Sequence, residues 1–346
     1  MDRNIARMAQ FFAGGECRLR PHFKAHKTPE IAKRQLAAGS CTGITCATVF
    51  EAEVASDFCD DILIANEVIG ADRCARVASL ASGAGLHGVR TITIAIDSEE
   101  GLRQISAAAR DQIGILVDLN VGQERCGLKP GPAAVALAQQ VAKTKGVRLR
   151  GVMGYEGHLM PIADRAERER RARAAMEQLV GTARLLRDAG LPCDIVSGGG
   201  TGTYDISGRV PGVTEIQAGS YVLMDTDYAR LDMPFEHAFS VLGTVVSRAG
   251  HAYSVADSGH KSTTKDHGLP GVKGIPGASV RTLNDEHAVI ELPPGNAIRV
   301  GDRIELLPSH TDPTINLHDV FYAMDGERVI ATWPITARGY REHRKP

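Results

Sequence analysis

Short apolar runs alternate with longer amphipathic stretches through the first two-thirds of the chain. The runs have the length and composition of strands, and the stretches between them repeat apolar residues at helical spacing. This pattern predicts eight strands, at residues 19–24, 42–48, 61–66, 91–96, 113–119, 149–155, 193–199 and 214–221. It predicts helices between them that include residues 29–38, 72–82, 98–109, 132–143 and 165–189.

Regular alternation of strands and helices is typical of α/β folds. Eight repeats match a (β/α)8 barrel of the TIM type, which is the fold we favour. A doubly wound open sheet produces the same alternation, because spacing alone does not show whether the sheet closes on itself. Both folds therefore remain open at this point.

The pattern changes after about residue 235. Strands joined by turns are predicted at residues 239–248, 253–257, 287–292, 303–307, 320–324 and 328–333. Asp325-Gly326 between the last two is a strong hairpin signal. We therefore predict a barrel domain over residues 1–235 and a smaller all-β domain over residues 236–346, with a loop or lid at residues 261–277.

Composition narrows the class of protein. The 346 residues are 43% hydrophobic, enough for a large core, and the net charge of −1 argues against a nucleic-acid or anionic-membrane surface. The seven cysteines form no CxxC pair, which favours reduced thiols in the cytosol. The sequence has no signal peptide and no apolar run of about 18 residues. We expect a soluble protein of the cytoplasm.

Residues suited to catalysis follow the predicted strands. Active sites of barrels form at the carboxyl ends of the strands. The residues at these ends are Lys24, Asn66, Arg125, Tyr155 with His158, the stretch from Ser197 to Thr203, and Gly219 with Ser220. Their convergence from separate strands is a stronger signal than any one motif.

Lys24 and the glycine-rich stretch after the seventh strand together suggest pyridoxal phosphate. A lysine can form a Schiff base with this cofactor, and the backbone N–H groups between Ser197 and Thr203 could surround its phosphate. Alternatives are a flexible glycine turn and Lys27 as the anchor. Arg125 could pair with the phenolate of the cofactor or with a substrate carboxylate, or could be an exposed loop arginine.

His310 and Asp312 form a candidate metal pair near the other end of the chain. On an extended segment, residues two apart share one face. Two protein ligands leave positions for water and substrate, and this donor set favours Mn²⁺ or Mg²⁺, although Zn²⁺ or Co²⁺ could also bind. Taken alone, a surface histidine and an Asp-Pro turn are the commoner explanation.

The chain resembles fold-type III pyridoxal-phosphate enzymes with an alanine racemase-like barrel. It is most similar to the group of D-threonine aldolases and 3-hydroxy-D-aspartate aldolases, which are related to D-serine dehydratases. The segments that carry the resemblance are residues 20–27, 50–53, 122–127, 154–157, 197–204, 217–228, 310–319 and 333–339.

The resemblance implies a role for each candidate residue. Lys24 would carry the cofactor, Tyr155 would lie beside its ring and Gln217 near its pyridine edge. Ser197 begins the cofactor loop, and the residues holding the phosphate would be Gly199, Gly200, Thr201, Gly219 and Ser220. The resemblance also implies a homodimer.

The His-x-Asp pattern of the metal pair matches the aldolases, whereas the dehydratases usually have His-x-Cys. The implied reaction is retro-aldol cleavage of a β-hydroxy-D-amino acid to glycine and an aldehyde. The metal would act on the β-hydroxyl, with His158 as a candidate base. Elimination to a keto acid and ammonia is the alternative, and a non-catalytic cofactor-binding protein is a third.

The sequence departs from the family pattern in three places. Ala47-Thr48 stand where the aldolases have Gln-Lys, and Pro161 stands where they have a histidine that serves the β-hydroxyl. His158, three residues before Pro161, could replace that histidine. The family has an apolar strand ahead of the first helix, whereas Met1–Asn4 are expected to lie inside that helix already.

Overall fold

The computed structural model describes residues 1–83, 91–110, 112–248 and 253–339. Contacts within the chain divide it into two compact units. The larger contains Ile5–Gly219, and the smaller contains Met1–Asn4 and Ser220–Arg338. Across the described ranges, no helix is both long enough and apolar enough to span a membrane.

The larger unit is built on a parallel sheet in the order β1-β8-β7-β6-β5-β4-β3-β2. Its strands are β1 (Arg18–Leu19), β2 (Ile44–Cys46), β3 (Asp61–Glu67), β4 (Thr91–Ile96), β5 (Ile113–Asp118), β6 (Val147–Gly154), β7 (Ile195–Gly198) and β8 (Glu215–Ile216). Isolated parallel bridges, Leu19 to Cys41 and His22 to Thr45, join the two edges. The sheet therefore curls and closes, which confirms the barrel and excludes the open, doubly wound alternative.

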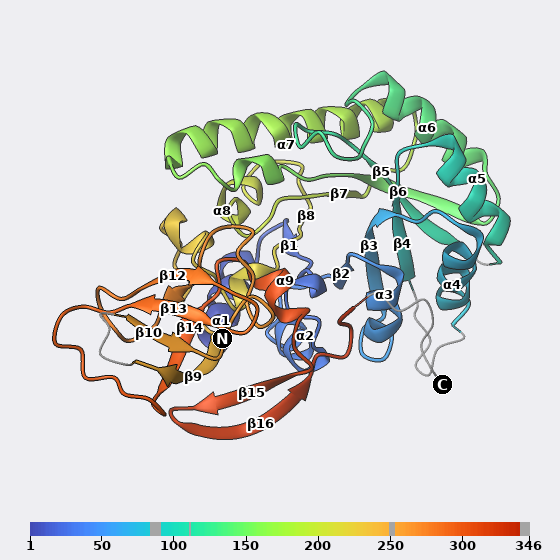
Figure 1. The fold of residues 1–346 in the computed structure, drawn as a ribbon. Helices are drawn as coiled ribbons and strands as arrows, with labels where there is room; N and C mark the ends of the chain where they lie inside the picture. Colours follow the sequence, from blue (N-terminus) through green and yellow to red (C-terminus); the bar gives the residue numbers. More distant parts are fainter. Residues whose placement is uncertain (84–90, 111, 249–252, 340–346) are drawn as a thin grey trace. The chain divides into compact units, whose positions relative to one another are not determined.

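Helices cover the outside of this sheet (Figure 1). They are α1 (Asp2–Phe12), α2 (Pro29–Ala37), α3 (Val49–Ala55), α4 (Ala71–Ala81), α5 (Glu99–Ala108), α6 (Pro132–Lys143), α7 (Arg165–Asp188) and the short α8 (Tyr204–Ser207). Side chains cap several of them, since Ser98 Oγ accepts a hydrogen bond from Gly101 N and Asp164 from Glu167 N. The predicted helices therefore begin and end within one residue of the observed ones.

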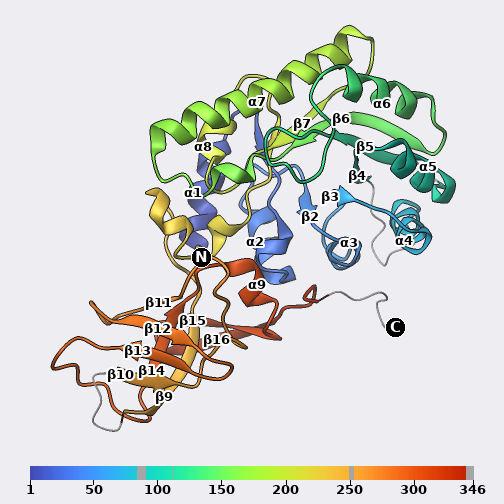
Figure 2. The ribbon, with the colours of Figure 1, turned by 45° about the horizontal axis from the view of Figure 1, so that its top comes forward.

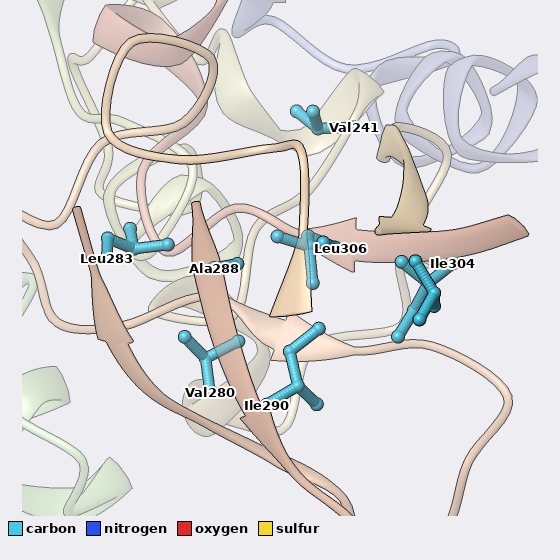
Figure 3. Packing of buried hydrophobic residues seen from close by; sticks show 9 residues of the cluster. Val241, Val280, Leu283, Ala288, Ile290, Ile304 and Leu306 are labelled. Carbon is cyan, nitrogen blue, oxygen red and sulfur yellow. The ribbon is translucent and has the colours of Figure 1, made fainter. Parts of the chain in front are cut away.

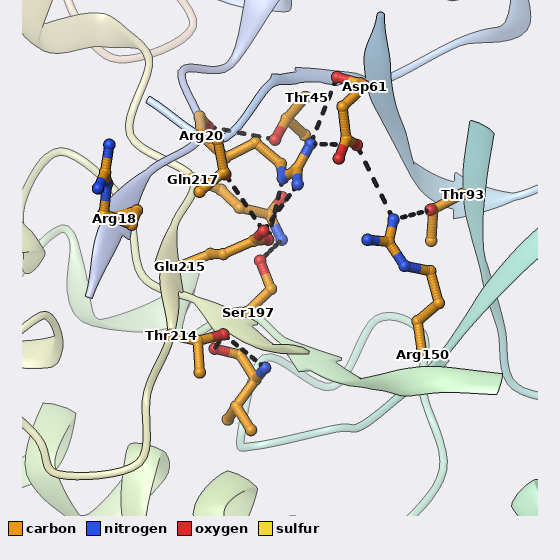
Figure 4. A network of polar contacts seen from close by, with 12 residues as sticks. Arg18, Arg20, Thr45, Asp61, Thr93, Arg150, Ser197, Thr214, Glu215 and Gln217 are labelled. Carbon is orange, nitrogen blue, oxygen red and sulfur yellow. Dashed lines mark hydrogen bonds and ion pairs between the residues drawn. The ribbon is translucent and has the colours of Figure 1, made fainter. Parts of the chain in front are cut away.

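The interior of the barrel is partly ionic. Arg20, only 1% exposed, donates from Nε and Nη2 to the carboxylate of Glu215 at 2.9 and 2.7 Å, and from Nη1 to Asp61 at 2.9 Å (Figure 4). Arg150 Nη1 donates to Thr93 Oγ1 at 2.8 Å. The buried charges of Arg20 and Glu215 are opposite partners, which is the condition under which charges are tolerated in a core. The apolar part of the interior contains Leu63, Ala95, Leu116, Met153 and Ile195.

The smaller unit contains a six-stranded antiparallel sheet in the order β11-β14-β9-β10-β13-β12 (Figure 2). Its strands are β9 (Val241–Ser247), β10 (Tyr253–Ala256), β11 (Gly271–Val272), β12 (Ser279–Leu283), β13 (Ala288–Glu291) and β14 (Arg303–Leu307). Alternate side chains point inward to one apolar cluster (Figure 3), formed by Val241, Val245, Ala256, Val280, Leu283, Ala288, Ile290, Ile304 and Leu306. This burial stabilises the sheet.

A separate hairpin joins β15 (Val320–Asp325) to β16 (Arg328–Pro334), with Gly326 at a φ of 59° in the turn. The hairpin predicted from Asp325-Gly326 is thus confirmed. The short helical elements of this unit are η3 (Ser220–Val222), η4 (Tyr228–Leu231) and α9 (Thr311–Ile315).

Three local predictions were wrong. The first strand ends at Leu19, so Lys24 lies in a 3-10 helix, η1 (Phe23–Ala25), instead of at a strand end. The segment 310–312 is not extended, because Thr311–Ile315 is helical and only His310 keeps an extended backbone. Strands β11 and β12 were not predicted, and β11 lies inside the segment expected to be a loop.

Candidate active site

Lys24 lies on η1, just beyond the point where the chain closes the barrel. The neighbouring His22 is half-buried as a residue, and desolvation of its ring, followed by the charges of Lys24, His26 and Arg125, lowers its pKa well below the ordinary value. His22 is therefore a neutral imidazole. Its Nδ1 atom is buried and has no hydrogen-bond partner among the described residues, which is consistent with a polar group of a bound cofactor reaching it.

Lys27, the rival anchor, is engaged elsewhere. Its Nζ lies 3.6 Å from Oε1 of Glu51, whose side chain is 1% exposed. Lys27 also has a left-handed backbone, with φ of 52°. This pairing argues against Lys27 as the lysine that forms the Schiff base.

Tyr155 and Arg125 come from the ends of neighbouring strands. Tyr155 follows β6, and the guanidinium carbon of Arg125, in the loop after β5, lies 5.9 Å from the centre of its ring. The ring is also packed against Gly200, where a Cβ atom would lie 2.9 Å from Tyr155 Cε2. The arrangement leaves a flat aromatic surface beside a cation, which suits a planar anionic ligand.

The glycine-rich loop between β7 and α8 bends tightly under this ring. Gly199 has a φ of 69°, and a Cβ at this position would lie 2.7 Å from Ile216 Cδ1. Ser197 and Thr201 are both buried, and Thr201 lies within the loop. Gly219 is equally confined, because its Cβ would lie 3.0 Å from the Cβ atoms of both His22 and Ala25. The close backbone approach that a phosphate requires is thus available in this loop.

Gln217 and Ser197 connect this region to the ionic interior of the barrel. Gln217 Nε2 donates to Ser197 Oγ at 3.0 Å, and the Ser197 hydroxyl hydrogen-bonds Glu215 (Figure 4). Burial acts to raise the pKa of Glu215, but the Arg20 guanidinium outweighs it, so the pKa lies below its ordinary value. A fixed negative charge therefore orients Ser197 and, through it, Gln217.

His158 lies in the 3-10 helix η2 (Gly157–Leu159) that follows Tyr155. Burial, and then the charge of Arg171, lowers the pKa of His158. Its Nδ1 is buried without a hydrogen-bond partner in the described part of the chain, and a Cβ at Gly122 would lie 2.8 Å from its ring. Pro161 is exposed and offers no such group. A neutral, tightly held imidazole can accept a proton.

The metal candidates belong to the smaller unit. His310 is the N-cap of α9, and Asp312 lies in its first turn. Both lie near Asp225, whose pKa is raised by burial and whose Oδ2 accepts a hydrogen bond from Thr311 N at 3.1 Å. The helix, and not a shared face of an extended segment, relates the two residues.

Two residues that the sequence did not single out lie beside His310. Asp266 Oδ2 is 2.5 Å from His310 Nδ1, and the ring of His267 stacks on that of His310 with centroids 4.0 Å apart. Potential ligand atoms of Asp266, His267 and His310 all lie within 4.8 Å of one another. Carboxylate and imidazole donors suit a divalent cation, so the residues present fit such a group. Their separation along the chain hides this from sequence patterns.

Ser220 begins η3 and belongs to the smaller unit, whereas the other predicted cofactor residues, from Lys24 to Gly219, belong to the larger one.

The larger unit also contains Asp118, an acidic residue that the sequence analysis did not predict as part of the site. Burial, and then Glu67, raises the pKa of Asp118 at the end of β5. Arg125 acts in the opposite direction. The sequence did not indicate the raised pKa of Asp118, because Glu67, which contributes to it, belongs to another strand.

Comparisons with known proteins agree with this architecture. Residues 1–227 match the family model for the N-terminal domain of alanine racemase, and residues 238–324 match that of a putative serine dehydratase domain. The chain is 39% identical to a D-threonine aldolase of Arthrobacter sp, over 98% of this chain and 90% of that protein. It is 32% identical to a 3-hydroxy-D-aspartate aldolase of Paracoccus denitrificans, over 98% and 89%.

The structural comparison gives the same result. The crystal structure of D-threonine aldolase from Filomicrobium marinum superimposes with a TM-score of 0.93 at 38% sequence identity. The superposition covers 97% of this chain and 92% of that one. The similarity therefore extends over both units and is not confined to the barrel.

Proposed function

Because this chain belongs to the alanine racemase-like family that includes D-threonine aldolase and 3-hydroxy-D-aspartate aldolase, we propose that it is a carbon–carbon lyase. It cleaves a β-hydroxy-D-amino acid to glycine and an aldehyde with pyridoxal phosphate as cofactor. The observation that carries the proposal is the similarity to D-threonine aldolase over nearly the whole chain. The site residues described above are the means by which this chain would perform the reaction.

Pyridoxal phosphate, when bound, supplies an electron sink for the carbanion left by breakage of the Cα–Cβ bond. Lys24 is the residue we propose to hold it covalently. Tyr155 would cover one face of its ring and Gln217 would contact the pyridine edge, held in place by Ser197. Ser197, Gly199, Gly200, Thr201, Gly219 and Ser220 would form its phosphate site.

The remaining residues act on the substrate. Arg125 would bind the substrate carboxylate or the phenolate of the cofactor, because a guanidinium recognises planar anions. The neutral His158 would take the proton from the β-hydroxyl through its ring nitrogen, which is the proton transfer that retro-aldol cleavage requires. The lowered pKa of His158 keeps it able to accept that proton at neutral pH.

A divalent cation would lower the pKa of the β-hydroxyl that it contacts. We propose His310 and Asp312 as its protein ligands. One imidazole and one carboxylate with exchangeable waters favour Mn²⁺ or Mg²⁺ over Zn²⁺ or Co²⁺. In the same unit His267 is a further donor, and Asp266 would orient the ring of His310 through their hydrogen bond.

Elimination of water or hydroxide is the second candidate reaction. The match of residues 238–324 to a putative serine dehydratase domain favours it. Asp312, where the resemblance gives dehydratases a cysteine, favours the aldolase reaction. A thiolate would favour Zn²⁺, a stronger Lewis acid for expelling hydroxide.

A product assay separates these reactions. The purified protein is incubated with D-threonine and with 3-hydroxy-D-aspartate, with and without a chelator, and glycine, aldehyde, keto acid and ammonia are measured. Glycine and aldehyde in equal amounts, diminished by chelation, support the proposal. Ammonia and keto acid without glycine would instead establish the dehydratase reaction.

We also propose that the enzyme is a cytoplasmic homodimer. The free state of all seven cysteines suits a reducing compartment. Hairpin β15–β16 carries exposed apolar side chains, Tyr322, Met324, Val329 and Ile330, each more than half exposed in the single chain. Such surfaces are commonly covered by another subunit. Light scattering on the purified protein measures its mass in solution. A monomer at the concentrations used for the activity assay would contradict the proposed homodimer.

A further inference from the structure

The carboxylate of Glu156 is completely buried beneath the glycine-rich loop. Its Oε2 accepts a hydrogen bond from the backbone N of Gly199 at 3.1 Å. Its Oε1 accepts from the hydroxyls of Thr203, at 2.7 Å, and Ser207, at 2.6 Å. One acidic side chain therefore holds the first residue of the turn, the end of the loop and the helix α8 together.

A second layer of bonds extends this contact. Gly200 N donates to the hydroxyl oxygen of Thr203 at 3.3 Å, and that hydroxyl in turn donates to Glu156. Thr203 N donates to the carbonyl oxygen of Gly200 at 3.2 Å. The backbone N–H groups of Gly199 and Gly200 are thus directed into the protein. Gly199 allows the left-handed turn of the loop, and Gly200 allows the close packing of the Tyr155 ring, so both shape the site that the phosphate would occupy.

Glu156 is also the immediate neighbour of Tyr155, whose ring packs on Gly200. The two residues that follow strand β6 therefore fix both the position of the aromatic ring and the shape of the loop. A buried carboxylate is costly unless its oxygens accept hydrogen bonds, and here the donors all come from the loop and α8. The donors of the loop and α8 therefore satisfy the oxygens of the carboxylate, and the carboxylate gives these buried donors an acceptor.

We infer that Glu156 is a positioning residue for the phosphate of the cofactor, a role that rests on the proposed function. Its hydrogen bonds fix the loop in its bent form before the cofactor arrives, so that binding does not have to order the loop. Glu156 would act on the phosphate through Gly199, Thr203 and Ser207, the residues that donate hydrogen bonds to it. Loss of the carboxylate should weaken the recognition of phosphate more than the recognition of the pyridine ring.

The test compares two aldehydes that differ only in the phosphate group. Cofactor-free protein is titrated with pyridoxal phosphate and with pyridoxal, and the visible absorbance of the Lys24 Schiff base gives a Kd for each. Glu156→Gln keeps the size of the side chain but places an amide donor against the loop donors. Ser207→Ala removes one donor without altering the carboxylate. Glu53→Gln is the control, because it breaks a two-bond pair with Arg76 between α3 and α4, on the outside of the barrel.

We expect Glu156→Gln to weaken binding of pyridoxal phosphate by about tenfold to a hundredfold, the range expected for losing a charged hydrogen bond. Pyridoxal binding should change little, so the preference for the phosphorylated aldehyde falls. Ser207→Ala should lower that preference by a smaller factor, and Glu53→Gln should leave it unchanged. If Glu156→Gln does not fold, the ratio of the two Kd values in Ser207→Ala becomes the test of the proposal.

Equal weakening toward both aldehydes, or an unchanged preference in the folded variants, would overturn the role of Glu156. Failure of the unaltered protein to form a Schiff base with pyridoxal phosphate would instead overturn the proposed function. The two failures are therefore distinguishable in one titration series.

Discussion

His310 donates a hydrogen bond from Nδ1 to Oδ2 of Asp266 across 2.5 Å. This bond leaves Nε2 as the nitrogen with a lone pair for a cation. A carboxylate on the far nitrogen of a ligating histidine orients the ring and raises its basicity. We predict that Asp266→Asn lowers the affinity for Mn²⁺ by about tenfold to a hundredfold.

Calorimetric titration of Mn²⁺ into the pyridoxal phosphate-loaded protein measures this effect, and the cofactor absorbance should be unchanged. Asp285→Asn is the matched control, because Asp285 is an exposed acidic residue of the same unit, its side chain 82% accessible. An unaltered Mn²⁺ affinity in Asp266→Asn would show that Asp266 does not support the site.

The second prediction concerns the cofactor lysine. Lys24→Ala should abolish the visible Schiff base and the adduct that borohydride traps, because the substitution removes the amine proposed to form both. Lys27→Ala should retain both, since Lys27 is paired with Glu51. Peptide mapping after reduction identifies the modified residue, and an adduct on Lys27 would refute the assignment.

The pH dependence should reveal His158. Its pKa lies below the ordinary value of 6.5, so the neutral base is present at pH 7 and protonation sets in only below pH 6.5. We therefore expect kcat/KM for D-threonine to fall on the acid side below pH 6.5 and not at neutral pH. His158→Gln should reduce the rate by about 10²–10⁴-fold and remove that acid limb. An acid limb that survives the substitution would assign the base to another group.

Breaking the ion pair inside the barrel should cost stability. Arg20→Ala leaves Glu215 buried without its partner, which typically destabilises a protein by about 3–5 kcal/mol. Arg103→Ala, which breaks a fully exposed and solvent-screened pair with Glu100 on α5, should cost much less. Urea unfolding of both variants gives the comparison. Equal losses in the two variants would mean that the buried pair contributes no more than a surface one.

The elements of the barrel were predictable because their signals are local. Ser98 caps α5 at the start of the helix predicted over residues 98–109, and the buried strands are short apolar runs. The first strand was predicted too long, since Pro21 lacks an N–H group and the chain turns into η1. At His310 the Asp-Pro that follows was itself a helix-start signal, because proline is favoured in the first turn.

The parts of the site that were missed depend on distant partners. Asp266 is 44 residues from His310 along the chain, and Glu156 is 43 to 51 residues from the groups it holds. Asp266 lies in a polar segment where an acidic residue is ordinary, and the resemblance at residues 154–157 assigned no role to Glu156. Only the folded structure brings these charges to their donors.

Strand β1 lies between β8 and the bridges to β2, so the first strand of the barrel pairs with the last. Arg20 and Glu215, which accompany this pairing, are 195 residues apart in the chain. Contacts over such distances form late, and a growing chain emerges from its amino end. Lys24 therefore reaches its final place only when nearly two-thirds of the polypeptide has been synthesised. On the proposed function, capture of the cofactor follows closure of the barrel, and chains truncated before Glu215 should bind no pyridoxal phosphate.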